Sequence, residues 1–158
     1  MKAIEKKIYT AEHRISKLRD LSLKINSFEE YMASRDNMDI AERNIQVAIE
    51  ACLDIGKIII ANQGLFEPSD NKGIFSVLAE SGIITKESLS FLMPMAGTRN
   101  ILVHGYDRID NALIYGIIKK HLNNFEDFLN QVRDFAENSS KRLKHSLHLK
   151  SSAIRSLK

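Results

Sequence analysis

The sequence is poor in cysteine, proline, glycine and tryptophan, which limits the architectures it can adopt. Its 158 residues include one cysteine, two prolines, seven glycines and no tryptophan. One cysteine excludes a disulfide framework within the chain, and Cys52 lies in an apolar helical pattern that predicts a small buried side chain. Few glycines and prolines, together with 44% hydrophobic residues, favour a helical domain over a β-sandwich or a disordered chain. The length predicts one domain that can bury a core.

Four kinds of segment are also missing, and each absence argues against a class of function. No apolar run reaches the roughly 18 residues of a membrane span. The N-terminus lacks the layout of a signal peptide, so we expect a cytoplasmic protein that does not contact a membrane. No glycine-rich phosphate-binding loop occurs. The Gly-Ser motif with paired aspartates that is typical of nucleotidyltransferases is also absent. No cofactor is therefore expected.

Positive charge is concentrated at one end of the chain. Of the 23 lysines and arginines, six lie in residues 141–158, which contain no acid, so residues 1–140 carry 17 basic against 20 acidic side chains. The formal net charge of +3 therefore comes from the final segment. A polyanion such as RNA would need a local site on the body or help from this tail. We predict a domain over residues 1–140 and a basic tail over residues 141–158.

Apolar residues recur at helical spacing through most of the chain. They predict a first helix through Leu18 that continues, with a kink at residues 22–27, to Met32. Further helices are expected at residues 38–62, 73–80, 86–103 and 111–138. Pro94 can kink or divide the helix over residues 86–103. These lengths favour an all-α antiparallel bundle of four long helices plus a short helix. Whether the basic tail extends the last helix or is mobile stays open.

Capping residues predict where the helices begin and end. Asp39 with Glu42 resembles a capping box at the start of the second helix. Thr85 and Asp110 are expected N-caps, and Gly105 is the expected terminator of the helix that Thr85 begins. Gly105 therefore ends a helix beside the most chemically suggestive residues of the chain.

Arg99, His104 and Tyr106 lie within eight residues at the end of an apolar helical run. The planar fork of an arginine donates paired hydrogen bonds to phosphate, and a histidine moves protons near neutral pH. The pair suggests RNA cleavage without a metal, in which Arg99 stabilises charge on phosphorus and His104 acts as general acid or base. A separation of five residues places them about 140° apart on a straight helix. They converge only if the helix ends between them or if a second copy of the chain completes the site.

Asn100, Glu50 and Asp54 are the candidate supporting residues. Asn100 and His104 lie four residues apart on one helical face, so the amide can orient the imidazole or a phosphate. Glu50 and Asp54 belong to a polar face of the second predicted helix. We expect one of these acids to position Arg99 or His104, unless that face is only solvated or lines a dimer.

Simpler interpretations of these side chains are also open. Arg99 can pair with the nearby Asp107, and Tyr106 can be an aromatic residue at the edge of the core. His145 and His148 have the spacing of metal ligands on a helix, but no third ligand is evident nearby, so no metal site is predicted.

A spaced motif of the chain resembles the signature of the HEPN superfamily: Arg99-Asn100-x-x-x-His104-x-Tyr106. The tyrosine at Tyr106 resembles that of the HepT-like toxin branch. Residues 41–55 resemble the second helix of that branch, and Phe75 with residues 78–84 resembles the segment that leads into its motif helix. The resemblance does not include the tail from Ser139 onward.

The resemblance implies a fold and a complete biochemical system. It implies a small helical bundle that forms a homodimer and brings two Arg–His motifs together in a cleft. It implies a metal-independent endoribonuclease, with RNA as the substrate and Arg99 and His104 as the catalytic residues. It also implies a minimal nucleotidyltransferase antitoxin as partner, which neutralises the toxin by binding it and by attaching AMP to Tyr106. The added negative charge would oppose RNA binding.

Two other functions fit the same residues. One is a non-catalytic nucleotide- or partner-binding subunit of a two-component nucleotidyltransferase, in which the arginine and histidine hold a nucleotide. The other is a purely structural helical oligomer. The intact Arg–His pair favours the ribonuclease, because a site that has lost catalysis need not keep both residues.

Overall fold

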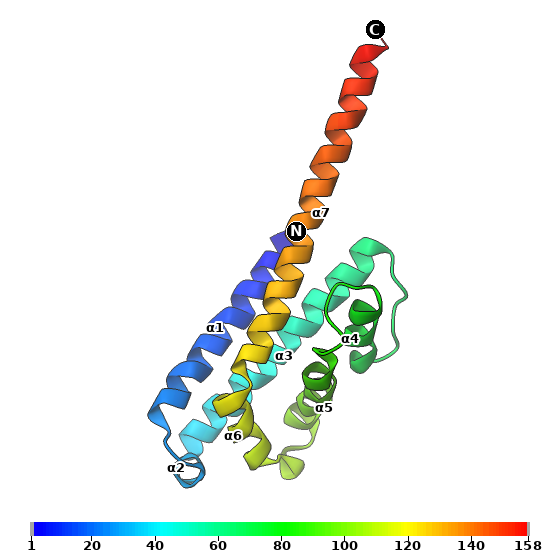
Figure 1. The fold of residues 1–158 in the computed structure, drawn as a ribbon. Coiled ribbons are helices and arrows are strands. Elements are labelled where there is room, and N and C mark those ends of the chain that lie inside the picture. The colour runs from blue at the N-terminus through cyan, green and yellow to red at the C-terminus, as the bar shows by residue number, and fades with distance from the viewer. Residues whose placement is uncertain (1, 158) are drawn as a thin grey trace.

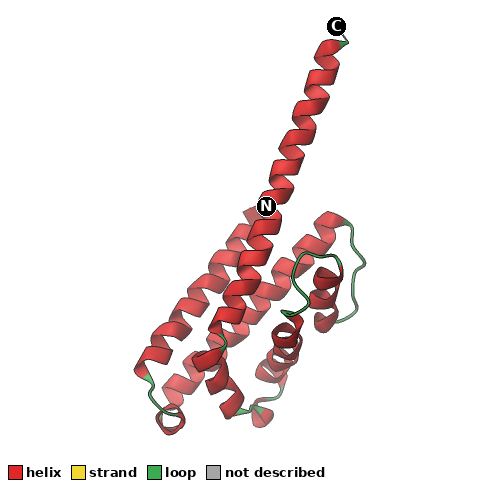
Figure 2. Cartoon of the chain, viewed as in Figure 1, coloured by secondary structure: helices red, strands yellow, loops and turns green. Residues whose placement is uncertain are grey.

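The computed structural model describes residues 2–157, whose regular elements are all helices joined by short turns and loops (Figure 2). The predicted all-α class is therefore confirmed. Within this range no helix combines the length and the apolarity that a membrane span requires. In chain order the helices, with η1 the one 3₁₀ helix, are α1 Lys2–Lys24, α2 Phe28–Ala33, α3 Arg35–Gln63, α4 Asn71–Glu80, α5 Leu89–His104, η1 Tyr106–Arg108, α6 Asn111–Lys120 and α7 Leu122–Ser156.

Helix α3 is the central helix of the bundle (Figure 1). It contacts α1, α2, α4, α5, α6 and α7. Helices α1 and α7 pack along one side of it, and α4 and α5 cover the other side. An apolar surface wider than a single stripe is expected of a helix that others surround. The largest fully buried side chains include Ile45, Ile49, Ile55 and Ile59 from α3 itself.

Ser34, and not the predicted Asp39, caps the N-terminus of α3. The backbone of Ser34 is extended, and its Oγ accepts the N–H of Asn37 at 3.2 Å, which is N-cap geometry. Asp39 lies inside the helix and pairs with Arg35 one turn earlier at 3.1 Å. The predicted capping box is wrong because its carboxylate bonds a side chain on the same helix. Gly64 ends α3 with φ +62°, a left-handed conformation that favours glycine.

The two other predicted N-caps have different outcomes. Helix α5 begins at Leu89, later than expected, because Thr85 Oγ1 accepts the N–H of Ser88 in a turn that precedes the helix. Asp110 caps α6 as predicted, since its Oδ1 accepts the N–H of Leu113 at 3.1 Å.

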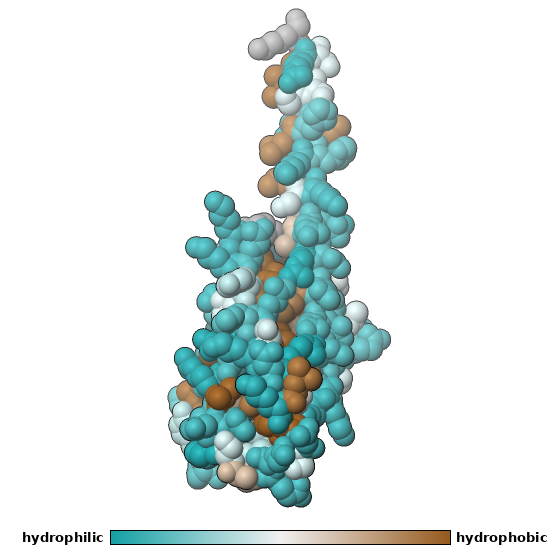
Figure 3. Space-filling view, turned by 90° about the vertical axis from the view of Figure 1, so that its left-hand side faces the viewer, coloured by the Kyte–Doolittle hydropathy of each residue, from teal (hydrophilic) through white to brown (hydrophobic). Residues whose placement is uncertain are grey.

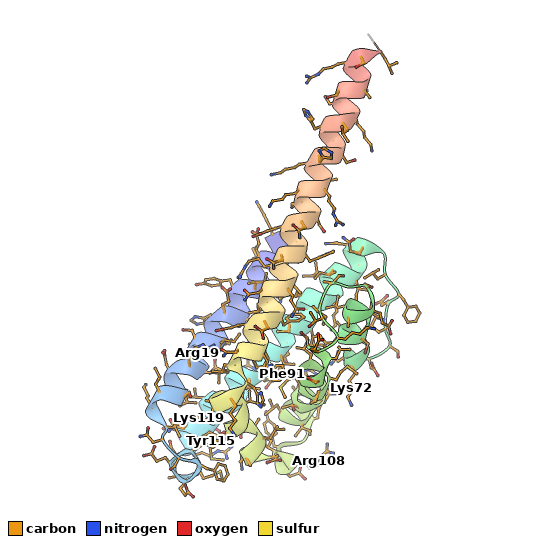
Figure 4. All side chains as sticks on the ribbon, viewed as in Figure 1. Arg19, Lys72, Phe91, Arg108, Tyr115 and Lys119 are labelled. Carbon is orange, nitrogen blue, oxygen red and sulfur yellow. The ribbon has the colours of Figure 1, made fainter. Side chains whose placement is uncertain are left out.

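The predicted single helix over residues 111–138 is divided at His121 into α6 and α7. Lys119, near the end of α6, donates hydrogen bonds to the backbone carbonyls of Ser22 and Ile25 at the end of α1 (Figure 4). Helix α6 therefore packs against α1 and α2 before the chain turns into α7. The prediction of one helix is wrong because this tertiary contact leaves no mark on helical periodicity.

The basic tail extends the last helix. Helix α7 crosses the predicted boundary between residues 1–140 and 141–158 without interruption and projects beyond the bundle (Figure 1). Residues 141–157 are all exposed. Apolar side chains are visible along the projecting part (Figure 3), where the exposed large hydrophobic residues are Leu143, Leu147, Leu149, Ile154 and Leu157.

Candidate active site at the end of helix α5

Helix α5 carries the predicted motif and ends where the sequence predicts. It contacts α3 and α4 and continues through Pro94 without a break. Gly105 ends it by donating its N–H to the carbonyl of Ile101 at 2.8 Å. The short helix η1 follows at once and begins with Tyr106. The motif residues therefore span the junction of a long helix and a tight turn.

Arg99 is held from the side of α3. Its Nε donates to Glu50 Oε1 at 3.2 Å, and the same oxygen accepts a hydrogen bond from Gln46 Nε2 at 3.1 Å. The Nη1 atom of Arg99 donates to Asn100 Oδ1 at 3.3 Å. The side chains of Arg99 and Glu50 are 28% and 33% exposed, so the pair is partly shielded from water. Glu50 takes the Nε of Arg99 and Asn100 takes one N–H of Nη1, so Nη2 and the second N–H of Nη1 stay available for an anion.

His104 is the last residue of α5, and its side chain is exposed. It makes no hydrogen bond or ion pair with Arg99 in the described chain. Helix α5 includes both residues, so the helix does not end between them. Their angular separation of about 140° is therefore kept. On an ideal helix, two side chains so separated point to different sides of the helix.

Tyr106 is 68% exposed, so it is not an aromatic residue of the core edge. Arg99 does pair with an acid, as the simpler interpretation expects, but the acid is Glu50 of α3 and not the nearby Asp107. The tyrosine hydroxyl therefore stands within reach of solvent, one residue after the end of the motif helix.

Asp54 lies on the same helix as Glu50, one turn further on, but meets a different partner. Its Oδ2 pairs with Lys7 Nζ of α1 at 3.0 Å. Of the two acids expected to position the motif, Glu50 contacts Arg99. Gln46 completes this small network, and Arg108, which the sequence did not single out, lies at the end of the turn that contains Tyr106.

His145 and His148 lie on the exposed projecting part of α7. Among the residues that the structure describes, no group of three or more histidine, cysteine, aspartate or glutamate side chains is arranged to hold a metal ion.

A carboxyl and a thiol are among the buried titratable groups that lie outside the motif. Burial raises the pKa of the Glu42 carboxyl above its ordinary value, and the guanidinium of Arg35, 3.8 Å away, partly opposes this shift. Burial also raises the pKa of the Cys52 thiol. Burial and a raised pKa both disfavour the thiolate that a nucleophilic cysteine needs.

The chain matches the model of the family described as "Ribonuclease HepT-like" over residues 11–132. This range contains the motif, Glu50 and most of the bundle. The chain belongs to the HepT-like ribonuclease family. The match ends within α7, so the projecting part of that helix lies outside the family model.

Curated relatives of this HepT-like chain are named as nucleases. It is 28% identical over 127 residues to the "mRNA nuclease HepT" of Shewanella oneidensis, a match that covers 80% of the chain and 93% of the relative. It is 28% identical over 109 residues to the "tRNA nuclease HepT" of Aphanizomenon flos-aquae, which covers 69% of the chain and 74% of the relative.

Solved structures share the fold of this HepT-like chain. A chain of a toxin–antitoxin crystal structure with AMP-PNP superposes with a TM-score of 0.78 at 26% identity, covering 85% of this chain and 99% of that one. A chain from the tri-AMPylated Shewanella oneidensis HEPN toxin in complex with MNT antitoxin gives a TM-score of 0.77 at 27% identity, covering 85% and 98%. The predicted HEPN-like fold is confirmed.

Proposed function

We propose that this protein is the toxin of a toxin–antitoxin pair, a metal-independent endoribonuclease in which Arg99 stabilises the phosphate and His104 is the general acid or base. The observation that carries this is the geometry of Arg99, whose Nε is held by Glu50 at 3.2 Å while its Nη2 stays available on the helix that ends with the motif's exposed histidine. The nuclease names of the relatives support the same chemistry.

The proposed reaction begins with attack of a ribose 2′-hydroxyl on the adjacent phosphorus. The O2′–P bond forms and the P–O5′ bond breaks, which leaves a 2′,3′-cyclic phosphate and a 5′-hydroxyl. A neutral imidazole of His104 takes the proton from the 2′-hydroxyl, and a protonated imidazole gives a proton to the leaving oxygen. Arg99 donates hydrogen bonds to the non-bridging oxygens as negative charge builds on them.

A homodimer completes this site in our proposal. Arg99 and His104 of one chain point about 140° apart on an unbroken helix, so a second copy must supply the missing partner. Helix α5 also leaves apolar residues only partly buried in the single chain, as expected of a helix that packs against another copy: Met93, Ile101 and Val103.

The proposed partner is a minimal nucleotidyltransferase antitoxin that adenylates Tyr106. The exposure of this side chain, 68%, supports access by a modifying enzyme. The matched toxin that is AMPylated and bound to an MNT antitoxin supports the same pairing.

RNA cleavage in the presence of EDTA tests the proposed activity. We expect Arg99→Ala to lower the cleavage rate by about 100- to 1,000-fold, and His104→Ala by about 100- to 10,000-fold. Circular dichroism and thermal melts should show both variants folded. Full activity in both variants would overturn the proposal, and tight binding of a nucleotidyltransferase without any RNA cleavage would favour the non-catalytic subunit.

Mixing the two inactive variants tests the shared site. A mixed dimer holds one site with both substitutions and one with neither. Random mixing of equal amounts should therefore restore about a quarter of the wild-type activity in a two-fold symmetric dimer. No recovery after mixing, with mixed dimers verified by mass spectrometry, would show that each site belongs to one chain.

A further inference from the structure

Gly105, between His104 and Tyr106, occupies a position where a side chain would displace the guanidinium of Arg108. Its φ of −132° is open to any residue, so backbone conformation does not require a glycine there. A Cβ added to Gly105 would lie 2.9 Å from Nη2 and 3.1 Å from Nε of Arg108. The guanidinium of Arg108 therefore lies directly against the backbone of the motif.

The turn η1 brings Arg108 back to this position. The backbone N–H of Arg108 donates to the carbonyl of Gly105 at 2.8 Å, which closes the turn. Figure 4 shows Arg108 at the junction between α5 and α6. Its side chain is exposed, and it has no hydrogen bond or carboxylate partner among residues 2–157. A guanidinium that lies against the motif backbone, with no carboxylate bonded to it, is suited to an anion that arrives from outside.

We propose that Arg108 binds a phosphodiester at this site and that Gly105 lacks a side chain so that the guanidinium can reach it. The inference rests on the proposed function, because it takes the anion to be the RNA backbone phosphate next to the one being cleaved. In the proposed function Arg99, which pairs with Glu50 of α3, binds the scissile phosphate. Arg108 follows His104 in the chain and lies in η1, so it is available for a neighbouring phosphate. The phosphate of a nucleotide carried on Tyr106 has the same chemistry and lies on the same turn.

RNA binding, measured apart from cleavage, tests this role. The probe is a fluorescein-labelled single-stranded RNA bound to full-length protein that carries His104→Ala, with dissociation constants measured by anisotropy at several salt concentrations. Arg108→Ala is expected to weaken binding about fivefold to tenfold. It is also expected to reduce the slope of log K against log salt by about 0.7, the contribution of one phosphate contact to a single strand. Lys17→Ala, which removes one charge from the exposed face of α1, is the matched control and should leave the slope unchanged.

A double-mutant cycle tests the role of the glycine. Gly105→Ala should weaken RNA binding about as much as Arg108→Ala, and should have little further effect when Arg108 is already alanine. Equal losses in both backgrounds would overturn the link between the two residues. Thermal melts of each variant separate this result from loss of folding.

The two phosphate sources are separated by a second measurement. If Arg108→Ala leaves RNA binding unchanged but slows adenylation of Tyr106 by the partner enzyme, the phosphodiester is that of the nucleotide. If neither changes, the inference is wrong. Because binding is measured without cleavage, a wild-type protein that binds RNA but never cuts it would overturn the proposed function and leave this inference standing.

Discussion

Replacing Glu50 with alanine is expected to lower both kcat and KM. Glu50 Oε1 holds the Nε of Arg99 at 3.2 Å and is itself held by Gln46 at 3.1 Å. Removing the carboxylate frees Arg99 to move, which lowers kcat. It also removes a negative charge close to the bound phosphate, which strengthens RNA binding and lowers KM.

The sizes of these effects follow from the geometry. A displacement of about 1 Å in a group that stabilises the transition state lowers kcat by about 100-fold. Two unit charges about 6 Å apart interact by about 0.7 kcal/mol in water, so loss of the carboxylate should lower KM about threefold. The pair itself is about a third exposed. Its loss should therefore cost at most about 1 kcal/mol of stability, or about 4 °C in melting temperature.

Steady-state cleavage of a short RNA, with thermal melts of each variant, measures all three quantities. Glu50→Gln keeps an oxygen acceptor for Arg99 but no charge, so kcat should recover to within about tenfold of wild type while KM stays low. Asp54→Ala is the matched control, because its partner is Lys7 on α1. A kcat for Glu50→Ala no lower than that for Asp54→Ala, or a raised KM, would refute the positioning role of Glu50.

Two further predictions concern the tail and a buried acid. Removing residues 141–158 should weaken RNA affinity and reduce its salt slope by up to about four, since the tail holds six cations and single strands contribute about 0.7 per contact. An unchanged slope would refute a role for the tail. Because burial raises the pKa of the Glu42 carboxyl, the folded state favours its protonated form and loses that stability as pH rises through the folded pKa. Glu42→Gln should therefore raise the free energy of unfolding at pH 8, and raise it less at pH 4. Urea unfolding of both proteins measures this, and an equal gain in the free energy of unfolding at the two pH values would contradict it.

The sequence predicted the parts of the fold that local chemistry determines. Gly105 and Asp110 end and begin helices as expected, because each needs only its own backbone or side chain to do so. The break at His121 was not predictable from periodicity, and it lies beside a contact between Lys119 and the end of α1, about 95 residues away in the chain. The capping box predicted at Asp39 is also wrong. Asp39 lies inside the helix and pairs with Arg35, and the N-cap is Ser34.

The candidate site was predictable in its residue types but not in its contacts. Glu50 and Asp54 lie one turn apart on one face of α3, so periodicity could not say which of them meets Arg99. Helix packing decides this, since Asp54 lies near Lys7 of α1 and Glu50 near α5. The sequence did not point to Arg108. A glycine at Gly105 is what a helix C-terminus commonly uses, so nothing in the sequence suggested that the residue also makes room for a guanidinium.

The charges around the motif nearly cancel, which bears on how a nucleotide on Tyr106 would silence the enzyme. Glu50 offsets Arg99 at 3.2 Å, and Asp107 adjoins Arg108 in the chain, so the site attracts RNA through directed N–H groups more than through net charge. A phosphodiester on the exposed tyrosine would repel an RNA phosphate about 6 Å away by only about 0.7 kcal/mol in water, a threefold effect. That is too small to block a nuclease, and salt screens it further. If Tyr106 is adenylated as proposed, we expect the block to come from occupancy, with the nucleotide taking the space and the guanidinium donors that the RNA backbone needs.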